Sequence, residues 1–336
     1  MLSSLISDIQ FISVFLSIST VILWSGPQRF LPGYSDSLPV AKTRQGLARG
    51  ESWVSRDGRL YHAFRSIPFA KQPIEGRRFK RPEALDEDDV WEGVADFNRE
   101  AKPCYQPGLG GFNRREDCLK LSVYTPNMKP ESPLPVMVFI HGGGFVVGNS
   151  GTISQGPAFL MDEDVILVSI SYRLGILGFL SLETDEAPGN LGMWDQRQAL
   201  IWVRQNIASF GGDPDKVTIL GESAGSMSVH YHVLSPQSRG LFTGAIMQSG
   251  TALSPYTNLM REPGHYARRV ADLVGCGETD NTLRCLQAVP VSSLYDHLFA
   301  FDECAMRADI GLTYPGMLQQ ILMDRDKGGL GNTESS

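Results

Sequence analysis

The stretch that most restricts how this chain can fold is residues 217–225, which read Val-Thr-Ile-Leu-Gly-Glu-Ser-Ala-Gly. A β-branched run stops at Gly221, and a helix-compatible segment follows from Ser223 to about Leu234. The pattern predicts a strand, a sharp turn with Ser223 at its apex, and a helix, so that the serine Oγ projects clear of the sheet. Glycines two residues before and after the serine let strand and helix approach without a Cβ clash. The stretch therefore favours a nucleophilic serine.

A second glycine motif follows an expected buried strand, Val136–Ile140, and reads His141-Gly142-Gly143-Gly144-Phe145. Three consecutive glycines leave backbone N–H groups uncovered and able to converge on one point. Acyl transfer needs such donors, because its tetrahedral intermediate carries an oxyanion. The same pairing of an HGGG loop with a serine elbow occurs in lipases and esterases. The two motifs together indicate acyl-transfer chemistry.

Six further blocks of sequence resemble motifs of one known protein family. They are residues 64–70, 78–82, 116–124, 171–175, 189–196 and 206–214. With the two glycine motifs, these blocks make the chain resemble the type-B carboxylesterase and cholinesterase-like family of α/β-hydrolases. The resemblance runs from about Gly46 to about Leu286.

The resemblance implies ester hydrolysis through an acyl-enzyme on Ser223. The oxyanion hole would be formed by the N–H groups of Gly143, Gly144 and Ala224. A small-molecule ester is the implied substrate, and neither a metal nor an organic cofactor is needed. The segment between the cysteines at 104 and 118 contains no tryptophan. Because cholinesterases hold a quaternary ammonium on an aromatic ring of that segment, a general carboxylesterase is favoured.

The same resemblance bears on the cysteines and on one pair of opposite charges. It implies disulfides Cys104–Cys118 and Cys276–Cys285, which compete with a zinc site that lacks C-x₂-C pairs and suitably placed histidines. Cys304 is left over. Arg173 and Asp195 are expected either to form a buried ion pair or to be two independent surface charges.

The catalytic acid and base are not recognisable in the sequence. In this family the triad runs serine, then Glu or Asp, then His, but Asp302–Glu303 has the wrong context and no histidine follows His297. His230 and His232 lie about two turns along the helix after Ser223, too far to serve as base. The chain is therefore expected to be C-terminally truncated, and the sequence leaves open whether it is active or inactive as it stands. The alternatives are a non-catalytic cholinesterase-like binding or adhesion protein, or a truncated gene product.

Alternating apolar strands and helical stretches predict the fold class. They are residues 136–140, 165–170, 194–209, 217–220, 223–234 and 245–248. This alternation predicts an α/β-hydrolase fold with a doubly wound, mostly parallel sheet, incomplete on its C-terminal side. We expect residues 40–300 to form the N-terminal part of a carboxylesterase type-B domain and residues 301–336 to be a tail outside the family.

The N-terminal segment bears on where the protein is located, and the net charge bears on its partners. Ile9–Trp24 is apolar and uncharged, so residues 1–25 are expected to be a signal peptide, with an uncleaved membrane anchor as the alternative. We therefore expect a secreted protein. The net charge of −7, with no basic stripe, argues against a nucleic-acid partner.

Overall fold

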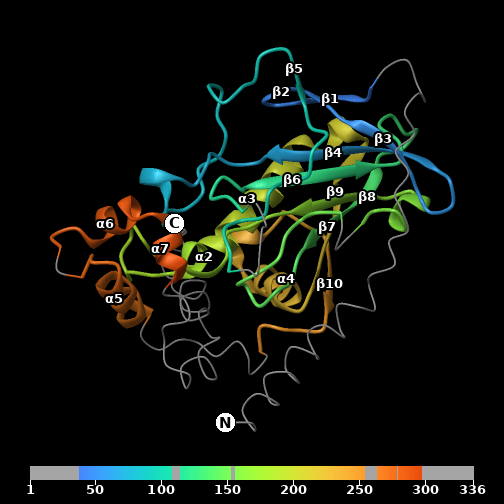
Figure 1. The fold of residues 1–336 in the computed structure, drawn as a ribbon. Coiled ribbons are helices and arrows are strands. Elements are labelled where there is room, and N and C mark those ends of the chain that lie inside the picture. The colour runs from blue at the N-terminus through green and yellow to red at the C-terminus, as the bar shows by residue number, and fades with distance from the viewer. Residues whose placement is uncertain (1–37, 108–113, 153–155, 254–262, 278, 297–336) are drawn as a thin grey trace, which may run out of the picture.

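The computed structural model describes residues 38–107, 114–152, 156–253, 263–277 and 279–296. The strands of its main sheet are β3 (Glu51–Val54), β4 (Leu60–Pro68), β6 (Lys120–Thr125), β7 (Leu134–Ile140), β8 (Ile166–Ile170), β9 (Gly212–Glu222) and β10 (Gly244–Gln248). Their order across the sheet is β10-β9-β7-β8-β6-β4-β3 (Figure 1). Neighbours from β10 to β8 are parallel, and those from β8 to β3 are antiparallel.

A second, smaller sheet lies beside the first. It consists of β1 (Val40–Thr43), β2 (Gly46–Arg49) and β5 (Val94–Asp96), in the order β1-β2-β5. It lies above β4 in the view of Figure 1.

The centre of the main sheet is buried because its strands are apolar on both faces. All five residues of β8 are buried, as expected for a central strand of the sheet that is covered on both faces. In β7, Val136, Val138 and Ile140 lie in the largest hydrophobic cluster. Met137 and Phe139, which point to the other face, pack against a smaller cluster that contains Trp53 and Tyr124.

Helices α3 (Leu191–Asn206) and α4 (Ala224–Leu234) contribute to the same core cluster. The cluster includes Leu200 and Val203 of α3 and Val229 and Tyr231 of α4. Both helices therefore cover one face of the sheet, with the 3₁₀ turn η3 (Ile207–Phe210) continuing α3. The smaller cluster on the other face includes Met161 of the 3₁₀ turn η2 (Leu160–Asp162).

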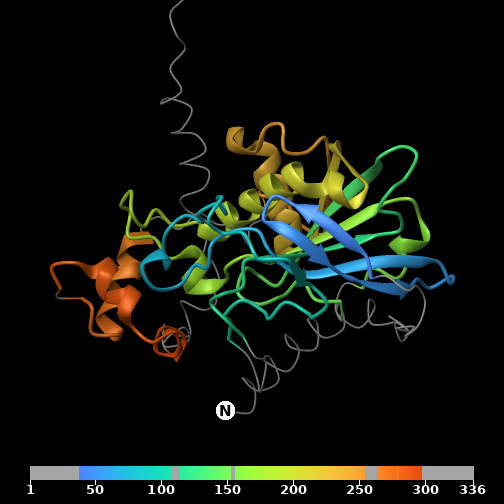
Figure 2. The ribbon, with the colours of Figure 1, turned by 90° about the horizontal axis from the view of Figure 1, so that it is seen from above.

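The remaining helices gather at one end of the molecule. They are α5 (Pro263–Leu273), α6 (Thr282–Ala288) and α7 (Val291–Asp296), next to α2 (Gly175–Phe179), and both views show the group at the left (Figures 1 and 2). They enclose a cluster of their own, with Leu177, Val270, Leu286 and Leu294 at its centre.

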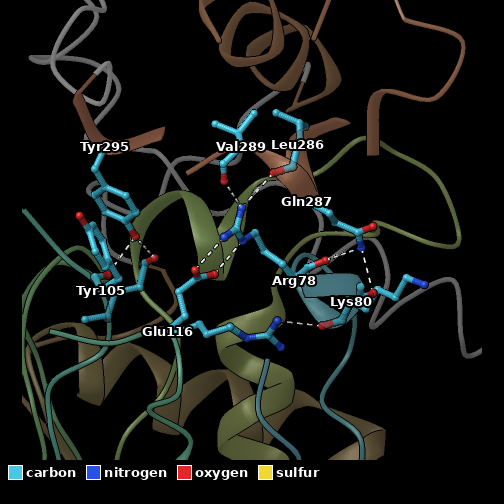
Figure 3. A network of polar contacts seen from close by, with 11 residues as sticks. Arg78, Lys80, Tyr105, Glu116, Leu286, Gln287, Val289 and Tyr295 are labelled. Carbon is cyan, nitrogen blue, oxygen red and sulfur yellow. Dashed lines mark hydrogen bonds and ion pairs between the residues drawn. The ribbon is translucent and has the colours of Figure 1, made fainter. Parts of the chain in front are cut away.

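Arg78 attaches this helical group to the rest of the chain (Figure 3). Its guanidinium forms two hydrogen bonds of 2.7 Å with the Glu116 carboxylate and donates to the carbonyls of Leu286 and Val289 at 3.1 and 2.6 Å. Nearby, the Gln287 Nε2 donates to the carbonyls of Gly76 and Arg78. The C-terminal end of α6 is therefore capped by the Arg78 side chain, which is distant in sequence.

Both predicted disulfides are present. Cys104 and Cys118 are joined with Cα atoms 5.0 Å apart, and Cys276 and Cys285 with Cα atoms 5.6 Å apart. The first closes the segment that carries Glu116, and the second joins the end of α5 to α6. The disulfide interpretation of these four cysteines is confirmed.

The α/β-hydrolase fold class is confirmed, and the observed elements follow the predicted ones closely. The largest difference is β9, which begins at Gly212 instead of Val217, because Leu134 of β7 pairs with Gly212. The predicted signal segment 1–25 and tail 301–336 lie outside the described residues. No helix in the described ranges is long and apolar enough to cross a membrane.

Candidate active site

Ser223 occupies a strained turn between β9 and α4. Its φ and ψ are 55° and −122°, a conformation that costs a non-glycine residue about 1–3 kcal/mol. The turn is held from behind, since the Ser223 N–H donates to the Gln248 carbonyl at 2.9 Å and the Ser226 hydroxyl donates to Gly250. Within the described residues the Ser223 Oγ forms no hydrogen bond. The predicted strand, turn and helix are therefore observed, with the serine at the apex.

The glycine loop has two peptide planes whose carbonyls are fixed. The Gly142 carbonyl accepts a 2.8 Å hydrogen bond from the His141 Nδ1, and the Gly143 carbonyl accepts from the N–H groups of Val146 and Val147. A trans peptide directs its N–H opposite to its carbonyl. The N–H groups of Gly143 and Gly144 are thereby turned away from these bonds. In the described part of the chain, neither they nor the Ala224 N–H donate to another protein group.

The two glycine motifs are in direct contact. A Cβ atom built on Gly142 would lie 3.2 Å from the Ser223 Cβ and 2.6 Å from the Glu222 carbonyl. A Cβ on Gly225 would overlap the Ile140 carbonyl and lie 2.9 Å from that of His141. Glycine is required at these positions because the turn and the loop approach each other backbone to backbone. Sequence positions about eighty residues apart thus meet at the carboxyl ends of β7 and β9.

Glu222 lies beside the same contact. A Cβ on Gly142 would be 3.1 Å from the Glu222 Oε2, and burial raises the pKa of this carboxyl above its usual value. Nothing in the pattern around Glu222 predicts a proton-transfer role for it. Its carboxyl lies next to the serine and the glycine loop, and it therefore contributes to the electrostatic potential at both.

His141 is held as a neutral ring. It stacks on Tyr172 with ring centroids 4.4 Å apart, and the Tyr172 hydroxyl donates to the His141 carbonyl at 2.9 Å. Burial lowers the pKa of His141 to about 4. Because its Nδ1 donates to Gly142, the ring supports the glycine loop.

A buried ion pair lies at the start of α3. The Arg173 guanidinium donates to both carboxylate oxygens of Asp195 at 2.8 and 2.7 Å, and the Arg173 backbone N–H adds a third bond of 3.0 Å. The two side chains are 3% and 0% exposed. Of the two interpretations open from the sequence, the buried ion pair is confirmed.

A directed chain of hydrogen bonds links α3 and α4. The Ser238 hydroxyl donates to the His232 Nδ1 at 2.8 Å, and the His232 Nε2 donates to the Gln196 Oε1 at 3.0 Å. Gln196 then donates to the Ser228 hydroxyl, which donates to the carbonyl of Ala224. The chain ends at the first residue of α4, directly after Ser223.

The described histidines do not hydrogen-bond to Ser223. His230 accepts from the Ala252 N–H at 3.0 Å, His62 bonds to Ser52, and His232 belongs to the chain above. This agrees with the expectation that the two histidines of α4 do not act as the base. His297, Asp302–Glu303 and Cys304, considered from the sequence, lie outside the described residues. Within the described residues, no group of three or more His, Cys, Asp or Glu side chains is arranged to hold a metal ion.

Acidification is expected to lower the free energy of unfolding as the pH falls from about 6.5 to 4. Burial lowers the pKa of His232 to about 4, as it does for His141, whereas an unfolded histidine titrates near 6.5. In this interval the unfolded chain binds protons that the folded chain does not. The stability present above pH 6.5 is therefore lost as the pH falls through the folded pKa values.

Urea unfolding at pH 7.5 and pH 5 tests this expectation. In His232→Gln the loss between the two pH values should be smaller than in the unsubstituted protein, by on the order of 2 kcal/mol. His265→Gln, at an exposed position of α5, is the matched control and should show the full loss. Equal losses in both variants would show that His232 does not titrate as described.

One well-connected residue of the site was not predicted. Gln106, in the disulfide-closed segment, forms two hydrogen bonds with the backbone of Gly148 at the end of the glycine loop. The only sequence signal was its place two residues after Cys104. Nothing in a local pattern connects it to a residue 42 positions away.

Comparison with known proteins adds independent information. A sequence model described as "Carboxylesterase family" matches residues 37–314. The chain is 42% identical over 271 residues to Juvenile hormone esterase of Tribolium castaneum, which covers 78% of this chain and 45% of that protein.

Two mouse proteins are similarly close. Pyrethroid hydrolase Ces2a of Mus musculus is 43% identical, over 76% of this chain and 48% of its own length. Acylcarnitine hydrolase of Mus musculus is 44% identical, over 74% and 47%. The chain spans about half the length of the curated relatives it matches.

Proposed function

Because the chain belongs to the carboxylesterase family, we propose that it contributes the nucleophile and the oxyanion hole of a serine carboxylesterase. The observation that carries this proposal is the contact between the two glycine motifs. Ser223 lies at a strained turn, its Oγ forms no hydrogen bond within the described residues, and Gly142 lies directly against it. Backbone strain of this kind is typical of functional sites, and in the described residues the N–H groups of Gly143 and Gly144 beside it have no protein acceptor.

The proposed reaction begins with attack of the Ser223 Oγ on the carbonyl carbon of a small-molecule ester. The hydroxyl proton passes to a general base, and the carbonyl π electrons move to oxygen to give the tetrahedral oxyanion. Collapse expels the alcohol, which takes up the proton, and leaves an acyl-enzyme. Water then repeats the sequence and releases the acid. The described residues provide no hydrogen-bonded base for Ser223, and the proposal assigns that role to no residue.

Gly143, Gly144 and Ala224 are proposed as the oxyanion donors. Their N–H groups are free of protein acceptors in the described residues, and Ala224 adds the positive end of the α4 dipole. Since hydrogen bonds on the neighbouring carbonyls already fix two of the peptide planes, little reorganisation is needed when the oxyanion forms. Removing one such donor typically lowers kcat by about 10²–10³-fold.

Labelling with a fluorophosphonate tests the assignment of Ser223. The expected result is a covalent adduct on the tryptic peptide of residues 217–239, located at Ser223 by fragmentation. The intact mass of the labelled species should be measured in the same sample. An unlabelled native protein, or an adduct on another residue, would overturn the proposal.

We also propose that the protein enters the secretory pathway. Two disulfides are typical of an oxidising compartment. The labelling should therefore be carried out on both culture medium and lysate of expressing cells. Label found only in a cytosolic fraction, with free thiols at Cys104 and Cys118, would contradict this location without affecting the assignment of Ser223.

A further inference from the structure

Gln106 connects the disulfide-closed segment to the glycine loop. Its Oε1 accepts a 2.9 Å hydrogen bond from the Gly148 N–H, and its Nε2 donates to the Gly148 carbonyl at 2.8 Å. The same Nε2 donates to the Cys104 carbonyl at 3.0 Å. One amide side chain thus satisfies both backbone groups of Gly148 and ties them to Cys104. Such two-sided pairing fixes the position and the orientation of a backbone unit.

Gly148 lies directly behind the glycine loop. Its φ is 131°, and a Cβ built on it would overlap the His141 Nδ1 and lie 2.6 Å from the Gly142 carbonyl. These are the two atoms whose hydrogen bond orients the Gly142–Gly143 peptide. A shift of Gly148 toward these atoms must therefore move the His141 ring, the Gly142 carbonyl or both.

The segment that carries Gln106 is itself anchored. The Arg114 guanidinium donates to the Gln106 carbonyl at 2.7 Å, and the Tyr105 ring lies 4.9 Å from that of Tyr295. Figure 3 shows Tyr105 and Glu116 of this segment bound to the helical group by Tyr295 and Arg78. Because its own segment is held in place, Gln106 can hold Gly148 at a fixed position beside the glycine loop.

We propose that Gln106 is a positioning residue for the oxyanion hole. By holding Gly148, it keeps the His141 ring and the Gly142 carbonyl in place, and so keeps the Gly143 N–H aimed at the reacting carbonyl. A run of three glycines cannot hold this geometry alone, because glycine has the largest backbone freedom. The inference rests on the proposed function of Ser223 and adds to it the residue that preorganises the loop.

The test replaces Gln106 with methionine, which keeps the length of the side chain and removes its polar atoms. The matched control is Gln287→Met, since Gln287 also donates from its Nε2 to two backbone carbonyls, at 3.0 and 2.8 Å, but at η1 (Glu75–Arg77). In Gln106→Met we expect the rate constant of phosphonylation and kcat for a short-chain ester to fall about 10–100-fold, with KM changed less than about 3-fold. The control should keep both rates.

A conservative variant adds a readout that loss of folding would not produce. Gln106→Glu keeps an acceptor for the Gly148 N–H but loses the donor to the two carbonyls while the carboxyl is ionised. Its rate deficit relative to the unsubstituted protein should narrow as the pH is lowered from 8 toward 5, because protonation restores one O–H donor. A pH-independent deficit would count against the donor role.

Amide hydrogen exchange measures the loop without catalysis. The amides of residues 142–148 should exchange at least about 10-fold faster in Gln106→Met than in Gln287→Met. Unchanged exchange together with unchanged phosphonylation would overturn the positioning role. A native protein that takes no label, yet shows faster exchange in Gln106→Met, would instead overturn the proposed function and leave the positioning role supported.

Discussion

Ser223→Ala and Ser223→Gly are expected to abolish ester hydrolysis equally while differing in stability. Either change removes the nucleophile, which typically costs about 10⁴-fold or more in kcat. The φ of 55° and ψ of −122° are strained for alanine as for serine, whereas glycine adopts them freely. After allowance for the greater entropy of glycine in the unfolded chain, Ser223→Gly should raise the free energy of unfolding by about 1 kcal/mol.

Urea titrations of the three proteins at one pH measure this difference. Ser223→Ala should match the unsubstituted protein within about 0.5 kcal/mol, since the Ser223 Oγ forms no hydrogen bond in the described residues. If Ser223→Gly were no more stable than Ser223→Ala, the turn would not be strained in solution. If either variant still hydrolysed esters at the original rate, the proposed nucleophile would be wrong.

Asp195→Ala is expected to cause the largest loss of stability of any single change considered. It leaves the Arg173 guanidinium, which is 3% exposed, without its carboxylate. Removing one member of a buried ion pair typically costs about 3–5 kcal/mol, because the remaining charge stays desolvated. Domains are stable by only about 5–15 kcal/mol, so the variant should unfold at a much lower urea concentration.

An exposed ion pair of the same chemistry provides the control. Asp215 pairs with Arg204 at 3.3 Å, with side chains 78% and 48% exposed, so Asp215→Ala should cost less than about 1 kcal/mol. The double change Arg173→Met with Asp195→Leu should be less destabilising than Asp195→Ala alone, since no uncompensated charge remains. A double variant as unstable as the single one would show that the loss comes from packing.

The parts of the structure predicted from sequence are those with a local pattern. The strand before Ser223 and the helix after it follow from an apolar run, two glycines and a helix-compatible segment, and the structure has them within a few residues. The disulfides followed from a family resemblance. The start of β9 was missed because Asp213-Pro214-Asp215-Lys216 has no apolar pattern, although the backbone there continues the strand.

The contacts that organise the site are long-range and were not predictable in this way. Gln106 binds Gly148 across 42 residues, and Arg78 caps the Leu286 carbonyl across 208. In both cases a side chain satisfies backbone groups, which pair with any donor or acceptor of suitable geometry. Such a contact imposes no pattern on the residues that provide the backbone. The direction of β6 against β8, which is antiparallel, was equally invisible in the alternation of apolar residues.

The short spacing of the two disulfides bears on the order of events when the chain folds. Cys104 and Cys118 are 14 residues apart and Cys276 and Cys285 are 9 apart, whereas β7 must pair with β9 across β8, α2 and α3. The entropy of closing a loop rises with its length, so each cysteine meets its native partner sooner than one from the other pair. In an oxidising compartment each pair can therefore form before the sheet is complete. Among these four cysteines, proximity along the chain therefore favours the native pairs over pairs that join the two segments.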